Sequence, residues 1–190
     1  SLWEDNRAGK SGLTQPLSPY FSGCRCWSLD AAHQPDLSFV PYILTGSREQ
    51  LDELKAQASW DVLVWNPRYR RGSLGIVVFP EAQVRAQAWD LRGVLNAAWI
   101  LPDHDPLRGY FERVLANNFQ FLKQQSMALD EGDATGWQPG AYGNNNGALA
   151  PWQQDYLASG VILAAKRKIP GAIDFLKWEN GFLGGRFLSQ

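Results

Sequence analysis

Three residues between positions 85 and 92 combine positive charge with an aromatic ring. Arg85, Trp89 and Arg92 follow one another at steps of four and three, so a helix places them on one face. Two guanidinium groups that flank an indole are suited to bind the carboxylate of a uronic acid while the ring stacks on the sugar. The alternative is an ordinary amphipathic helix, with arginine stems along its rim and Trp89 in the core. These three residues are our first candidates for substrate binding.

A second group with similar spacing follows a break in the helical pattern. Trp152, Asp155 and Tyr156 again stand at steps of three and four, just after Pro151, which is well placed as a first helical residue. Tyr156 could carry a proton in a lyase-type β-elimination, and Asp155 could act in hydrolysis. The alternative for Asp155 is that the helix macrodipole favours an acid in a first turn. We name Asp155 and Tyr156 as catalytic candidates and Trp152 as a substrate-binding candidate.

Asp30 and His33 form a third candidate pair, just before the first helical segment. A carboxylate near an imidazole can orient or charge it for acid/base catalysis. The alternative is structural, with Asp30 capping a short turn and His33 packing at a helix start. Both residues are kept as catalytic candidates.

A long segment rich in glycine and asparagine, residues 130–150, precedes the second group. It lacks both helical propensity and an apolar face, and loops longer than about 12 to 15 residues in compact domains are usually functional or disordered. Trp137 and Tyr142 lie within it. The sequence therefore predicts a lid over a ligand, with these two rings as further substrate-binding candidates.

Other chemistries lack the residues they need. Cys24 and Cys26 are too close for an unstrained disulfide, and with two histidines in the chain they do not make a zinc pattern. No phosphate-cradling loop, dinucleotide fingerprint or nucleophile elbow is present, so we predict no metal and no cofactor. With 18 basic and 19 acidic residues there is no overall field to attract nucleic acid. No apolar run is long enough to cross a membrane.

Helical periodicity and its interruptions divide the chain into three helical hairpins. Asp36 is expected to cap the first helix and Gly46 to end it. Pro170 and Gly171 break the last pair. A β-prone run at 76–79 indicates one short strand or an extended connector. The paired helical patterns span 36–46 with 51–58, 84–98 with 110–122, and 151–169 with 173–182. The expected fold is all-α.

The domain organisation follows from the same pattern. Residues 1–29 show no sustained period and are expected to form an extended arm, whereas residues 30–190 form the helical-hairpin domain. The chain does not begin with methionine, so we expect a piece of a longer protein, whose other domains are candidate partners. The three hairpins can also form a smaller helical bundle.

The hairpins resemble part of an α/α-toroid, the ring of helical hairpins found in six-hairpin glycosidases and in the helical domains of polysaccharide lyases. The resemblance extends over about residues 30–187 as an architectural pattern and includes no recognised catalytic signature. It rests on Asp30, His33, Pro35, Pro41, Tyr42, Thr45, Gly46, Leu51, Arg85, Ala88, Trp89, Arg92, Pro102, Asp103, Trp152, Asp155 and Tyr156. It implies a bacterial carbohydrate-active domain.

Two functions are consistent with these features. The first is a carbohydrate-handling domain that binds a polysaccharide or oligosaccharide and cleaves it by hydrolysis or β-elimination. An aromatic content of 13% suits it, because flat rings stack on the apolar faces of sugars, although most aromatic residues in a helical core simply fill space. The second is a non-catalytic helical interaction module of a larger bacterial surface or phage-like assembly protein. The sequence leaves the localisation open.

Overall fold

The structure is a computed structural model, and it describes residues 30–128, 135–141 and 150–188. Its α-helices are α2 (Phe39–Thr45), α3 (Arg48–Leu63), α4 (Val84–Ile100), α5 (Pro106–Leu122), α6 (Pro151–Lys166) and α7 (Ala172–Gly185). Two 3-10 turns, η1 (Ala31–His33) and η2 (Gly72–Leu74), and a π-helical turn, η3 (Lys123–Met127), complete the regular structure. Since these residues include no strand, the predicted all-α class is confirmed.

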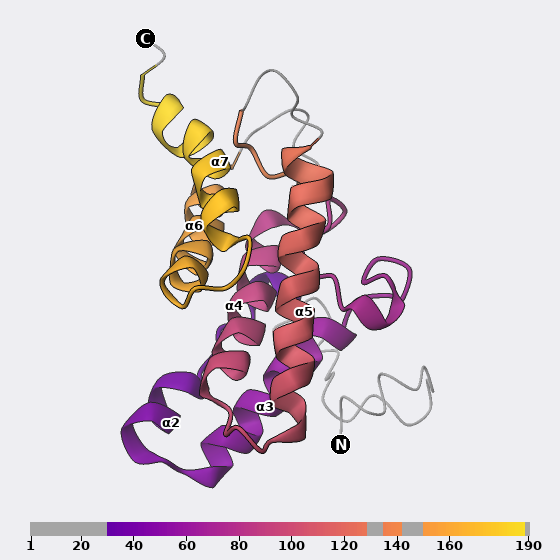
Figure 1. The fold of residues 1–190 in the computed structure, drawn as a ribbon, viewed down its shortest axis with the longest axis vertical. Coiled ribbons are helices and arrows are strands. Elements are labelled where there is room, and N and C mark those ends of the chain that lie inside the picture. Colours follow the sequence, from indigo (N-terminus) through magenta and orange to yellow (C-terminus); the bar gives the residue numbers. More distant parts are fainter. Residues whose placement is uncertain (1–29, 129–134, 142–149, 189–190) are drawn as a thin grey trace, which may run out of the picture.

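The three predicted hairpins are present. Helix α2 packs against α3, α4 against α5, and α6 against α7 (Figure 1). The first hairpin turns at Gly46, which has a left-handed φ of 66° and donates its N–H to the carbonyl of Tyr42. Such a residue at a helix C-terminus is commonly glycine because it has no Cβ to clash. Asp36 accepts the N–H groups of Ser38 and Phe39 and so satisfies the start of α2, as predicted.

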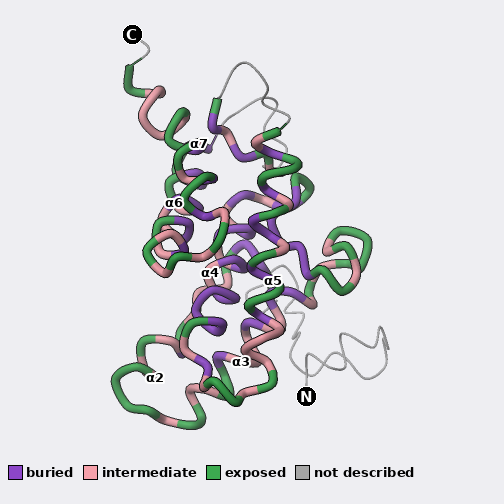
Figure 2. Tube along the Cα trace, viewed as in Figure 1, coloured by how far each residue is buried: buried purple, intermediate pink, exposed green. Residues whose placement is uncertain are grey.

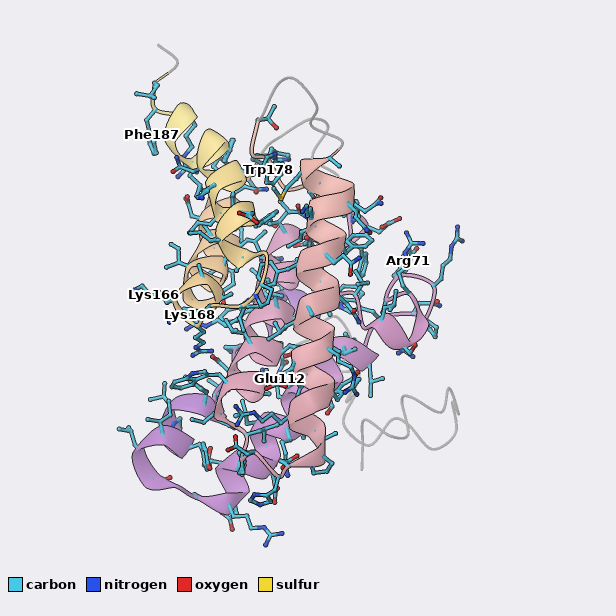
Figure 3. All side chains as sticks on the ribbon, viewed as in Figure 1. Arg71, Glu112, Lys166, Lys168, Trp178 and Phe187 are labelled. Carbon is cyan, nitrogen blue, oxygen red and sulfur yellow. The ribbon has the colours of Figure 1, made fainter. Side chains whose placement is uncertain are left out.

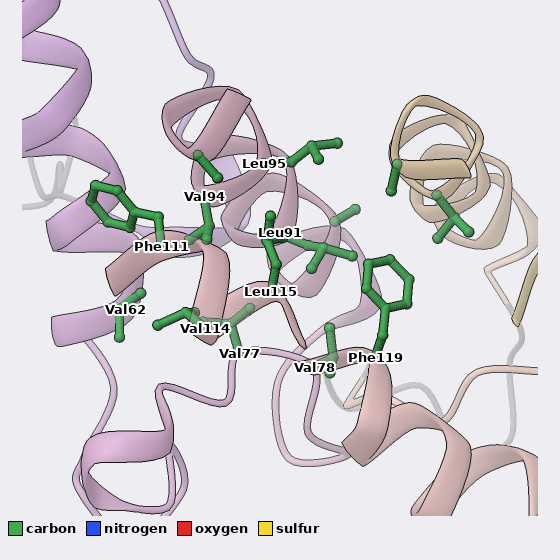
Figure 4. Close-up of a cluster of buried hydrophobic side chains, with 14 of the residues drawn as sticks. Val62, Val77, Val78, Leu91, Val94, Leu95, Phe111, Val114, Leu115 and Phe119 are labelled. Carbon is green, nitrogen blue, oxygen red and sulfur yellow. The ribbon is translucent and has the colours of Figure 1, made fainter. Parts of the chain in front are cut away.

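Helix α4 lies at the centre of the domain, in contact with α3, α5 and α6. Twelve of its 17 residues are buried, and Figure 2 shows this burial along most of the helix. Leu91 and Leu95 of α4 belong to the same buried cluster as Phe111 and Leu115 of α5 (Figure 4). Helix α4 therefore packs buried side chains against three neighbouring helices at once.

For the β-prone run at 76–79 the sequence predicted either a short strand or an extended connector, and the structure has the extended connector. All of its residues are buried, yet no neighbouring strand is available in the described residues to satisfy its backbone. Two side chains do this instead. Asn118 accepts the N–H of Val77 at 2.8 Å and donates to the carbonyl of Gly75 at 2.9 Å. Gln87 donates to the carbonyl of Phe79 at 3.1 Å.

Candidate functional site

Two of the residue groups predicted from spacing converge on one groove between α4 and α6. The groove has a volume of about 360 Å³ and opens to solvent. Helix α4 contributes Arg85 and Trp89, and the residues from α6 are Trp152, Asp155, Tyr156 and Ser159. The two helices begin side by side, because the N–H of Arg85 donates to the side chain of Gln153 at 3.0 Å.

Aromatic rings form much of the groove wall. The rings of Trp89 and Tyr156 lie 4.5 Å apart between centroids, tilted by 59°. Trp152 is 50% exposed, and the Arg85 guanidinium carbon lies 5.7 Å from the centroid of its ring. A flat apolar surface and a cation are therefore both accessible at the mouth of the groove.

The arginines of α4 form no ion pair in the described part of the chain, although the charge of Arg85 acts on the carboxylate of Asp30. Arg85 donates its Nε hydrogen to the side-chain oxygen of Gln83 at 2.8 Å, which fixes the guanidinium without neutralising it. Arg92 does not line the groove, but its charge acts on the hydroxyl of Tyr156. Since neither arginine forms an ion pair with a described residue, positive charge is available beside the aromatic wall.

The hydroxyl of Tyr156 is buried and lies near the guanidinium of Arg92. Burial raises the pKa of Tyr156 to about 12, although the charge of Arg92 and a hydrogen bond with its side chain act in the opposite direction. A phenol with this pKa is almost entirely protonated at neutral pH, so few molecules carry the phenolate that a base requires.

Asp155 forms an ion pair at the outer edge of the groove. Its Oδ1 lies 2.5 Å from Nη2 of Arg186, just beyond the end of α7. The charge of Asp155 also acts on Glu179 of α7, a residue that was not among the sequence predictions. Glu179 is completely buried, and neither carboxyl oxygen has a hydrogen-bond partner among the described residues. Burial, together with the charge of Asp155, raises the pKa of Glu179 to about 8.

Asp30 and His33 form the predicted pair at η1. The Nδ1 of His33 lies 2.6 Å from Oδ2 of Asp30, and the other carboxyl oxygen accepts the N–H of Ala32. Burial alone would raise the pKa of Asp30, but the contacts with Ala32 and His33 and the charge of Arg85 hold it below its ordinary value. The pair does not line the groove.

Trp137, one of the two predicted lid residues, does not line the groove. Trp137 packs edge-on against Phe182 of α7, with ring centroids 4.7 Å apart. It contacts that helix because Gly136, with a left-handed φ of 67°, approaches the α7 backbone too closely for a side chain. Tyr142 lies outside the described residues, as does most of the predicted lid, and so does the predicted arm at 1–29.

A network of buried glutamines fixes the start of α6 and hence one wall of the groove. The side-chain oxygen of Gln138 accepts a hydrogen bond from the hydroxyl of Ser126 at 2.7 Å, and its amide nitrogen donates to the side-chain oxygen of Gln87 at 2.9 Å. It also exchanges two hydrogen bonds with Gln154 through its backbone, at 3.0 and 2.8 Å. Because all three glutamines are completely buried, these contacts satisfy groups that would otherwise be costly to bury.

Two buried acids lie close together between α3 and α4, away from the groove. Asp61 and Asp90 are completely buried, and Trp65 donates its indole N–H to Asp90 at 2.6 Å. Burial raises the pKa of both carboxyls well above the ordinary value, and the charge of Asp90 adds to the effect on Asp61. In the described residues no group of three or more His, Cys, Asp and Glu side chains is arranged to hold a metal ion.

Of the helices described here, none combines the length and the apolar character needed to cross a membrane. No protein-family model matches the chain, and neither the curated proteins nor the solved structures compared with it gave a match. The chemistry of the groove is therefore the basis for a functional proposal.

Proposed function

We propose that the α4/α6 groove binds a saccharide that carries a carboxylate, such as a uronic acid within an oligosaccharide or polysaccharide. One observation supports this most strongly: the guanidinium of Arg85, which forms no ion pair with a described residue, lies beside the half-exposed ring of Trp152. A planar guanidinium matches a carboxylate with two hydrogen bonds, and an indole face covers the apolar side of a sugar ring. The two contacts together select sugar acids over neutral sugars.

The remaining groove residues support binding more than bond cleavage. Hydrolysis of a glycosidic bond ordinarily uses two carboxyl groups, and Asp155 supplies the one carboxyl of the groove lining, already paired with Arg186. For β-elimination, the raised pKa of Tyr156 makes it a poor base. As a neutral phenol next to Trp89, Tyr156 instead extends the aromatic wall.

The proposal predicts which substitutions weaken binding. Arg85→Gln should reduce the affinity for a uronic acid oligosaccharide by at least about tenfold and leave the affinity for its neutral counterpart unchanged, because one charge-assisted pair is lost. Trp152→Ala should lower the affinity for both oligosaccharides by about tenfold, because both stack on the same ring. Isothermal titration calorimetry with both oligosaccharides measures these changes.

Two substitutions away from the groove serve as controls. Trp99→Ala removes another tryptophan that is 50% exposed, and Arg71→Gln removes an exposed arginine. Both should bind like the unmodified chain. The proposal fails if no acidic or neutral saccharide binds, or if Arg85→Gln weakens the two ligands equally.

A further inference from the structure

Helix α2 carries an apolar surface that no described part of the chain covers. None of its residues is buried, and Leu37, Val40, Ile43 and Leu44 are 72%, 58%, 50% and 78% exposed. Figure 2 shows α2 as exposed or intermediate along its length, in contrast to α4. Val40, Ile43 and Leu44 lie within α2 at positions i, i+3 and i+4 and so share one face of the helix, and Leu37 precedes the helix by two residues. A contiguous exposed apolar face of this kind marks an interaction site.

Trp99 of α4 extends this surface at the N-terminal end of α2. It is 50% exposed, and its ring centroid lies 6.0 Å from that of Phe39, the first residue of α2. Arg167 lies over both rings, with its guanidinium carbon 4.4 Å from the centroid of Trp99 and 5.5 Å from that of Phe39. We call Leu37, Val40, Ile43, Leu44 and Trp99 the α2 patch.

The two ends of the α2 patch carry opposite charge. The basic residues lie at the N-terminal end of α2, because Arg167, just after α6, contacts the ring of Phe39. Its neighbours Lys166 and Lys168 are exposed (Figure 3). At the other end, α2 leads through Gly46 and Ser47 into the start of α3. That start carries the exposed acids Glu49 and Glu53, together with Asp52, which is paired with Arg48 and Lys55.

We propose that the α2 patch binds a second copy of this chain, with the two α2 helices antiparallel across a two-fold axis. In such a symmetric interface the same patch is used on both copies. The antiparallel arrangement brings the basic end of each α2 patch onto the acidic end of the other, while the apolar side chains meet at the centre. An apolar centre with a polar, charged rim is the usual composition of a stable protein interface. The inference is independent of ligand binding in the α4/α6 groove.

Sedimentation equilibrium on the full chain tests the proposal. We expect a reversible dimer, and Leu44→Glu should raise its dissociation constant by at least about tenfold, because it places a charge in the apolar centre. Leu44 is 78% exposed, so the variant should keep its fold, which circular dichroism checks. The matched control is Ile173→Glu on α7, which alters an apolar residue that is 50% exposed outside the α2 patch and should leave the dimer intact.

A charge exchange tests the antiparallel arrangement. Lys166→Glu and Glu53→Lys should each weaken the dimer, and the two changes together should restore it, because opposite charges again face each other. The proposal is overturned if the chain stays monomeric at all concentrations. This holds equally if the monomeric chain binds anionic lipid vesicles in a flotation assay. A dimer that is insensitive to Leu44→Glu, or a double variant without rescue, also overturns it.

Discussion

Glu179→Gln is expected to raise the free energy of unfolding by about 5 kcal/mol at pH 9 and to change it little at pH 4. Glu179 is completely buried and has no hydrogen-bond partner in the part of the chain that the structure describes, and burial raises its pKa from 4.5 to about 8. Because the folded-state pKa lies above the unfolded one, the stabilising contribution is complete below pH 4.5 and is lost as the pH rises to about 8. Glutamine does not ionise, so the variant avoids this loss.

Urea denaturation from pH 4 to pH 9 measures the difference between the two proteins. Glu81→Gln, in the exposed turn before α4, is the matched control and should follow the unmodified chain. Asp61 and Asp90 remain in the Glu179 variant, and their raised pKa values should leave it with some loss of stability at high pH. Identical pH profiles for the unmodified chain and the Glu179 variant would show that Glu179 is already paired or hydrated.

Asn118→Leu is expected to lower the free energy of unfolding by about 3 kcal/mol. The substitution removes both contacts with the buried connector and leaves the N–H of Val77 and the carbonyl of Gly75 without partners. Each unsatisfied buried group costs about 1–3 kcal/mol, and the added leucine methyl groups recover part of this by apolar burial. Chemical denaturation at a single pH gives the change in stability.

The neighbouring Asn117 provides the control for this experiment. Asn117 donates to the carbonyl of Leu74 at 2.9 Å, but this contact is exposed to solvent, so water replaces it in Asn117→Leu at a cost below about 1 kcal/mol. Equal losses in the two variants would mean that the satisfaction of the buried connector is not what Asn118 contributes.

The hairpins could be predicted because local signals agree at each of them. Apolar periodicity, the glycine at position 46 and the Pro170–Gly171 break are all features of the nearby chain. In the structure Gly46 caps the end of α2, and Gly171 stands directly before α7, although α6 has already ended at Lys166. The connector at 76–79 was ambiguous for the opposite reason. Its β-branched residues favour extended backbone, but whether a strand pairs with it depends on distant groups, here Asn118 and Gln87. The toroid resemblance stays a prediction.

The candidate site was predicted in pieces. Spacing placed Arg85 with Trp89, and Trp152 with Tyr156, on single helix faces, but their meeting depends on how α6 packs against α4. Glu179 was missed because an acid in a helical pattern is normally exposed. One signal was present, since Glu179 stands four residues after the buried Phe175 and seven after Ala172, on the core face of α7.

The α4/α6 groove also couples ligand binding to heat stability. Its two walls come from separate hairpins, and the unfolded chain holds neither wall in place. A ligand that contacts both walls therefore binds the folded chain alone and raises its melting temperature by mass action, by an amount set by ligand concentration relative to the dissociation constant. Thermal-shift screening of a saccharide library therefore tests the proposed binding without an enzymatic assay.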